Sequence, residues 1–259
     1  MMIGARTAAW AKSGGGVPTA KDYVQDGLVL LIDGKENGGL GTHVQSLSSW
    51  KNLSNVGQFS DVRLSGEYIV GDNYIQFNDS AINSSTGTGI GRCDVLFPIQ
   101  ERTIEVCFSG LKLNWISDSN RKNAMFTYPN TFGSLWISMG NWNNLGSLFF
   151  GLWTSLGVDT TFYGPGAAIQ TPIDKLTSFS LNTVNRIFVR DSNEYSSSIS
   201  TSTESFQGTL DLFNRSTDFA RPFNGKLHCM RIYNRALSAA EMIANQDIDY
   251  LRFGPAKTT

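Results

Sequence analysis

The sequence predicts an all-β fold: a two-layer antiparallel sandwich with one short helix near the C-terminus and an extended N-terminal tail. Two observations support this prediction. Many short segments alternate apolar and polar residues, which is the period-two pattern of half-buried strands. Serine, threonine and asparagine are abundant, with 28, 20 and 20 copies among 259 residues. All three compete with the helical backbone for hydrogen bonds and therefore favour strands and turns.

The expected strands lie, in chain order, at residues 27–32, 74–77, 103–108, 134–139, 148–153, 176–181, 186–190, 209–213 and 226–233. The first of them is apolar on both faces, which predicts a strand that is covered on both sides. Residues 80–92 are expected to form a polar loop. Ser238 and Glu241 fit a capping box, which predicts a helix over residues 239–248.

A chain of this length can bury a sizeable core, and sandwiches reach about 250 residues as one unit. We therefore expect a tail over residues 1–21, a single sandwich domain over 22–253 and a short C-terminal tail over 254–259. The glycine run at 14–16 followed by Pro18 is typical of a flexible linker. Within the N-terminal tail, Ile3, Arg6 and Trp10 are the candidate anchor residues that a partner could order.

Charge is scarce, at 17% Asp, Glu, Lys and Arg with a net charge of −1, against roughly 25% in an ordinary soluble domain. A chain with this charge balance lacks the excess of Lys and Arg that is typical of a nucleic-acid-binding protein. The sequence contains no apolar run of about 18 residues, so we expect no membrane span. The three cysteines have no metal-site spacing and are expected to be buried free thiols, which suits synthesis in a reducing compartment.

The aromatic middle of the chain holds the candidate binding residues. In residues 134–139 the aliphatic side chains share one face of the predicted strand and Trp136 lies on the other. Trp153 holds the equivalent position in residues 148–153. Aromatic rings and uncharged hydrogen-bonding groups suit a carbohydrate ligand. We therefore name a candidate carbohydrate site of Trp136, Asn141, Trp142, Trp153 and Tyr163. The alternative is that these aromatic residues belong to the core of the second sheet.

Catalysis is not expected. Glycoside hydrolysis needs two facing carboxylates, yet Glu105 is the single acid in its predicted strand. A serine-hydrolase site needs a positioned histidine, and the two histidines, His43 and His228, are expected to have structural roles. No cofactor is required by this prediction. A calcium ion is compatible with the oxygen-rich turns at 72–73, 78–79 and 191–194, although such residues are also what turns require. The sequence does not assign its ligands.

Two ends of the predicted domain resemble a known family. Residues 23–34 (YVQDGLVLLIDG), followed by residues 50–55 (WKNLSN), are similar to the opening strand and following motif of laminin-G-like, concanavalin A-type lectin domains. Residues 75–78 (IQFN) and 103–106 (TIEV) resemble two later strands of that family. The segment from Phe223 to Glu241, which contains RIYNRALSAAE, resembles the end of its domains.

This resemblance implies a jelly-roll sandwich whose concave face or loop rim binds carbohydrate. The N-terminal tail and the RIYNRALS ending also resemble accessory virion proteins of tailed bacteriophages and prophages. The resulting hypothesis is a non-catalytic, lectin-like adhesion module on a phage particle or cell surface, made in the cytoplasm without a signal peptide. The alternative is a purely structural virion component, such as a capsid decoration, head fibre or tail protein, docked through residues 1–21. The expected partners are a surface glycan or other virion proteins, and self-association into a homo-oligomer is left open.

Overall fold

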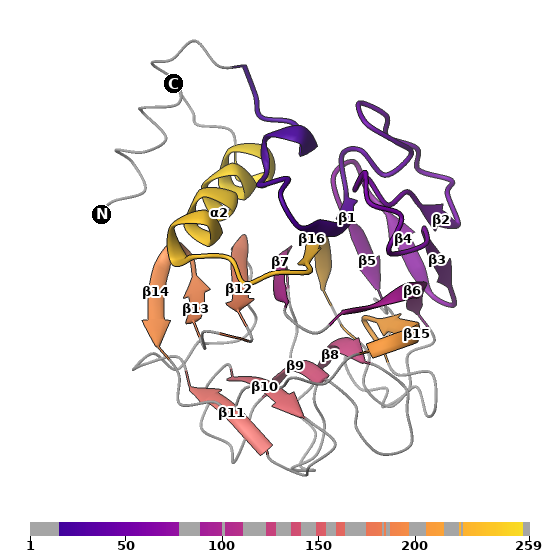
Figure 1. Cartoon of the computed structure of the whole chain (residues 1–259). Helices are drawn as coiled ribbons and strands as arrows, with labels where there is room; N and C mark the ends of the chain where they lie inside the picture. Colours follow the sequence, from indigo (N-terminus) through magenta and orange to yellow (C-terminus); the bar gives the residue numbers. More distant parts are fainter. Residues whose placement is uncertain are drawn as a thin grey trace.

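The computed structural model describes residues 16–77, 89–99, 102–110, 123–127, 136–140, 149–153, 159–163, 175–182, 184, 187–196, 206–214, 223 and 225–255. Within these residues the chain forms two antiparallel sheets and one α-helix near the C-terminus (Figure 1). The predicted all-β sandwich is confirmed. No helix in the described part of the chain is long and apolar enough to cross a membrane.

The first sheet has the strand order β14 (Asn193–Ser196), β13 (Ile187–Arg190), β12 (Thr177–Asn182), β7 (Thr103–Ser109), β16 (Lys226–Tyr233), β5 (Ile75–Phe77) and β4 (Tyr68–Val70), and β1 (Leu28–Asp33) also pairs with β16. The second sheet has the order β11 (Asp159–Tyr163), β10 (Phe149–Trp153), β9 (Trp136–Gly140), β8 (Asn123–Thr127), β15 (Phe206–Leu212), β6 (Ile90–Ile99), β3 (Val62–Ser65) and β2 (Ser49–Trp50). The four strands β8 to β11 are described by their backbone pairing.

The main core fills the space between the two sheets. Ile104, Val106 and Phe108 of β7 belong to it, as the alternation in that strand predicts. Leu210 and Leu212 of β15 contribute to the same cluster from the second sheet. Each of these side chains is fully buried, and full burial of such a side chain contributes about 1.5–3 kcal/mol.

Strand β1 is covered on both faces, as its continuous apolar run predicts. Leu30 and Ile32 join the core between the sheets, whereas Leu28 and Leu31 join a second cluster beneath the helix. The strand ends where Gly34 donates its backbone N–H to the carbonyl of His228 at 2.7 Å. A Cβ atom at Gly34 would lie 2.2 Å from the carbonyl oxygen of Asn73, so only glycine fits this close approach.

The helix α2 (Ala239–Phe253) covers the outer face of the first sheet (Figure 1). It begins at the predicted capping box, in which the Glu241 N–H donates to Ser238 Oγ at 3.3 Å and the Ser238 N–H donates to the Glu241 carboxylate at 2.8 Å. The predicted end at residue 248 is too early. The helix continues to Phe253 because Asp249 and Arg252 make buried contacts with the sheet, and Gly254 and Pro255 then end it.

Several elements escaped sequence prediction. Residues 90–92, expected in a polar loop, begin β6, because Ile90 is buried and the strand pairs with β15 and β3. The pattern also missed β2, β3, β4, β8, β11 and β14. Strands β13 and β14 are joined at Asp191 and Ser192, which both have positive φ angles, 49° and 61°. Helix α2 holds this strained turn, because the Ser192 N–H donates to Gln246 Oε1 at 2.8 Å.

Candidate functional site

Three of the predicted binding residues in the aromatic middle of the chain, Trp136, Trp153 and Tyr163, fall on neighbouring strands of the second sheet. The register places Trp136 of β9 directly opposite Trp153 of β10. It also places Phe149 of β10 opposite Tyr163 of β11. Because residues two apart along a strand share a face, these four aromatic positions belong to one face of the sheet. The two pairs are about 14 Å apart along β10, from a rise of about 3.4 Å per residue.

The pairing also identifies which face this is. Leu212 lies in the core between the sheets, and its register partner is Phe126, which pairs in turn with Ile137. One position along, Asp211 pairs with Thr127, which pairs with Trp136. The two tryptophan positions therefore belong to the face opposite the core.

The same outer face continues across the described strands β6 and β3. Arg92 pairs with Asp211 in register, and Arg63 pairs with Arg92. The Arg63 guanidinium forms an ion pair with Asp94 at 3.0 Å, with side-chain exposures of 56% and 38%. Such exposed charges are expected on a solvent-facing surface. Asp211 is buried and accepts a hydrogen bond from Arg92 Nε at 3.1 Å.

The remaining predicted site residues lie outside the described residues. These are Asn141 and Trp142 of the carbohydrate site and Ile3, Arg6 and Trp10 of the anchor. Trp136, Trp153 and Tyr163 are placed by strand register. The structure therefore brings three of the five carbohydrate-site positions onto one sheet face, while their role in binding stays a prediction.

A second concentration of polar groups lies beneath α2, on the outer face of the first sheet. Arg231 of β16 donates from Nε to Glu105 of β7 at 2.6 Å and from Nη1 and Nη2 to Asp249 of α2 at 2.6 and 2.8 Å. The side chains of these three residues are completely buried. Tyr23 adds its hydroxyl, which donates to Asp249 at 2.8 Å, and its ring lies 4.1 Å from the Arg231 guanidinium. The sequence pattern did not reveal this cluster.

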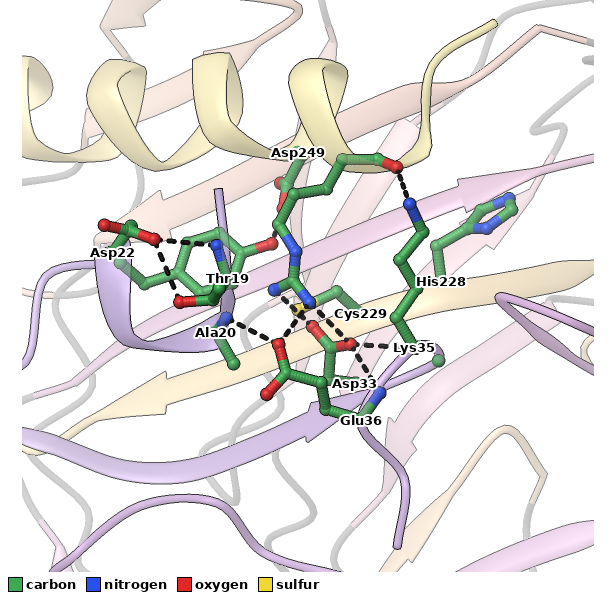
Figure 2. Close-up of polar contacts among 12 residues, drawn as sticks. Thr19, Ala20, Asp22, Asp33, Lys35, Glu36, His228, Cys229 and Asp249 are labelled. Carbon is green, nitrogen blue, oxygen red and sulfur yellow. Dashed lines mark hydrogen bonds and ion pairs between the residues drawn. The ribbon is translucent and has the colours of Figure 1, made fainter. Parts of the chain in front are cut away.

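A second arginine continues the cluster toward the N-terminal segment. Arg252 donates to both oxygens of Asp33, at 2.6 and 3.0 Å, and to Glu36 at 3.0 Å. Figure 2 shows Asp33 and Glu36 gathered near the end of α2, with Ala20 beside them. The Ala20 N–H donates to Glu36 at 2.9 Å. Ala20 belongs to the short helix η1 (Ala20–Asp22), so the cluster fixes this part of the chain to the domain.

These carboxylates are structural. Burial raises the pKa of Glu105, which is one property of a catalytic acid. However, Glu105 accepts hydrogen bonds from Ser180, Arg231 and Asn245 and has no exposed surface. A sugar cannot reach it while α2 is in place. An acid in the middle of an apolar strand, such as Glu105 in TIEVCF, is the signal that could have predicted a buried charged partner.

His228 contacts a serine, but the arrangement does not fit nucleophilic catalysis. Its Nδ1 lies 3.0 Å from the backbone oxygen of Asn73, which can only accept, so Nδ1 carries the proton and Nε2 accepts from Ser109 Oγ at 2.8 Å. Burial lowers the pKa of His228 to about 4. Such an imidazole is a weak base at neutral pH, and its third partner is a neutral carbonyl rather than a carboxylate.

Two of the candidate calcium turns are described, and their oxygens serve the fold. Asp72 accepts a hydrogen bond from Gln45 at 3.0 Å, and Asp191 accepts from the hydroxyl of Tyr250. Asn78 and Asp79 lie outside the described residues. In the described part of the chain, no three His, Cys, Asp or Glu side chains gather as a metal site would require.

No model of a known protein family matches the sequence, and no curated protein is similar to it in sequence. Solved structures do share its fold. The fourth domain of an extracellular arabinanase from Geobacillus stearothermophilus, in complex with arabinotriose, is 12% identical with a TM-score of 0.51, covering 87% of this chain and 100% of that domain. The binding domain of botulinum neurotoxin DC, in complex with rat synaptotagmin II, is 13% identical with a TM-score of 0.54, covering 89% and 53%.

A mutant Trypanosoma rangeli sialidase with trans-sialidase activity is 14% identical with a TM-score of 0.51, covering 93% of this chain and 36% of that one. The chain thus spans about a third of the sialidase and about half of the neurotoxin domain. At these identities the comparisons establish the β-sandwich fold alone.

The buried arginine makes a first prediction. Replacing Arg231 with methionine leaves Glu105 and Asp249 buried without their cation, so we expect the free energy of unfolding to fall by about 3–5 kcal/mol. The matched control is Arg63→Met, which breaks an exposed pair and should cost less than about 1 kcal/mol. Urea unfolding followed by circular dichroism measures both. Equal effects of the two substitutions would contradict the structural role of the cluster.

His228 makes a second prediction. Its pKa is about 4 in the folded protein and about 6.5 in an unfolded chain. Between these values the unfolded state binds the extra proton, so the folded state loses stability as the pH falls from about 6.5 to about 4, by up to about 3 kcal/mol. We expect His228→Gln to remove this part of the pH dependence. His43→Gln should retain it, because His228 is still present. Unfolding curves at pH 7, 5.5 and 4.5 test this, and an unchanged pH dependence in His228→Gln would refute it.

Proposed function

We propose that this chain is a non-catalytic, lectin-like module that binds glycans through the outer face of its second sheet. The observation that carries the proposal is the register that sets Trp136 opposite Trp153 and Phe149 opposite Tyr163 on the face away from the core. Aromatic rings on such a face offer flat apolar surfaces to the C–H faces of sugars. The spacing of the two pairs is one that an oligosaccharide of a few units can span.

The structural neighbours support this proposal. The arabinanase domain was solved with arabinotriose, and the neurotoxin binding domain was also solved in complex with SialylT. Those ligands belong to those proteins. Together with the sequence resemblance to laminin-G-like, concanavalin A-type domains, they favour a sugar ligand over a nucleic acid for this sandwich. We further propose display on a phage particle or a cell surface, which rests on the resemblance of the tail and the RIYNRALS ending to virion accessory proteins.

The distribution of charge in the described residues favours binding over hydrolysis. Two close pairs of carboxylates, Glu105 with Asp249 and Asp33 with Glu36, are each held by an arginine beneath α2. On the outer face of the second sheet, Asp94 and Asp211 are each paired with an arginine as well. The aromatic positions lie on the opposite side of the domain from the acids beneath α2, across the core. A hydrolase would need two carboxylates beside the sugar.

A purely structural virion component remains the second candidate, and one observation favours it. The first described residues are fixed to the domain on its α2 side, since Ala20 bonds Glu36 and the Val24 N–H donates to Asn245 of α2 at 2.9 Å. The described chain is therefore fixed at Ala20 and Val24, on the side of the domain away from the aromatic face. This geometry suits docking through the tail, with or without display of a ligand face.

The glycan proposal is tested by removing the aromatic rings. We expect Trp136→Ala and Trp153→Ala each to weaken binding at least tenfold, or about 1.4 kcal/mol, on an array of neutral and sialylated oligosaccharides that includes arabinotriose. The control is Phe97→Ala, which removes an aromatic side chain of β6 that is 61% exposed and should leave binding unchanged. An array on which the full chain binds no sugar would contradict the proposal.

The docking alternative is tested by two truncations that differ in whether residues 16–21 are kept. Removal of residues 1–15 should abolish incorporation into particles and leave the melting temperature unchanged. Removal of residues 1–21 also deletes the Ala20–Glu36 contact and the burial of Pro18 and Ala20, so the melting temperature should fall by roughly 3–10 °C. Sedimentation with particles and differential scanning fluorimetry provide the two measurements. Incorporation of the shorter truncation at the level of the full chain would rule out docking through the tail.

A further inference from the structure

The first sheet brings two of the three cysteines together. The register pairs Cys107 of β7 directly with Cys229 of β16. Opposite residues of an antiparallel pair have Cα atoms about 4.5–5.5 Å apart, which lies within the range of about 4.4–6.8 Å that a disulfide spans. Both side chains are fully buried in the same cluster beneath α2. The two residues are distant in sequence, so their proximity follows only from the strand order.

The third cysteine cannot take part. Cys93 lies on β6 of the second sheet and belongs to the core between the sheets. Cys107 and Cys229 face away from that core, toward the helix. Of the three cysteines, two therefore lie close enough to form a disulfide, and the third has no cysteine beside it.

We propose that Cys107 and Cys229 form a cross-strand disulfide when the chain folds in the presence of a small-molecule disulfide, and that Cys93 stays reduced. A thiolate from one cysteine attacks the small-molecule disulfide and releases one thiol. The second cysteine then attacks the mixed disulfide, forming the Cys107–Cys229 bond and releasing the second thiol. The two protein thiols are oxidised, the small disulfide is reduced, and the two protons end on the released thiols.

The surroundings of the pair decide when this reaction can occur. Burial raises the pKa of both cysteines in the folded protein, and the thiolate is the reactive form. The bond must therefore close before α2 covers the sheet, or during an opening of the helix. The Arg231 guanidinium donates from Nη1 to Cys229 Sγ at 3.3 Å. Once closed, the bond joins the two strands that carry Glu105 and Arg231.

The experiment refolds the full chain with oxidised glutathione or with a reducing agent. After oxidative refolding we expect an intact mass lower by two hydrogen atoms, one titratable thiol in denaturant instead of three, and a peptide map that links residues 107 and 229. The oxidised protein should melt roughly 5–15 °C above the reduced protein, because the bond closes a long loop in the unfolded chain.

Two variants provide matched controls for the thiol count. Cys93→Ala should still form the bond and leave no free thiol, whereas Cys107→Ala should form none and leave two. Because the wild-type measurements need no substitution, a variant that fails to fold does not decide the question. Three free thiols after oxidative refolding, or a link that involves Cys93, would overturn the proposal.

Discussion

The contact between Arg231 and the two carboxylates of Glu105 and Asp249 holds helix α2 on the outer face of the first sheet. Moving these charges out of water costs several kcal/mol per ion, and the cost is offset only because the guanidinium is matched on its Nε edge and on both Nη groups. The three residues come from β16, β7 and α2. Tyr23 brings in the N-terminal segment through its hydroxyl and ring. These four segments, which are distant in sequence, must therefore keep one arrangement for every buried charge to have its partner. A shift of α2 along the sheet would leave the buried charges unpaired.

This arrangement determines which surfaces are free for a ligand. The first sheet is covered on one face by the core, and on the other face α2 covers β7, β12 and β13. The second sheet is covered by the core on one face, and its other face bears the exposed Arg63–Asp94 pair and the positions of Trp136 and Trp153. The N-terminal segment is held on the α2 side. Attachment and ligand binding can thus occupy opposite sides of one domain, which lets the glycan-binding and docking proposals coexist.

The sequence predicted the parts of the fold that depend on local patterns. Complete burial of β1, the core face of β7 and the Ser238–Glu241 capping box follow from residues close in the chain, and all are confirmed. Strand β6 was missed entirely; at its start Gly89, Gly91 and Arg92 resemble a loop, although Ile90 and Cys93 are buried. The buried ion cluster and the Cys107–Cys229 pair arise from contacts between distant segments, which no local pattern contains. The alternation of residues predicted that Trp136 and Trp153 each lie on the face of their strand opposite the aliphatic side chains. That the two positions lie directly opposite each other depends on the pairing of β9 with β10, which no local pattern contains.

The low charge of the sequence has a further consequence in the folded protein. Asp33, Glu105, Asp249, Arg231 and Arg252, together with Asp211, are buried, so part of the scarce charge of this sequence lies in the interior of the domain. Charges used in this way fix the helix and cannot serve a ligand. The described surface combines exposed ion pairs, such as Lys51–Asp61 and Arg63–Asp94, with Ser, Thr and Asn, which donate and accept hydrogen bonds without the desolvation cost of an ion. A surface on which cations are paired with acids, as Lys51 is with Asp61 and Arg63 with Asp94, suits the uncharged hydroxyl groups of the proposed glycan ligand, whereas a polyanion would need a patch of unpaired cations.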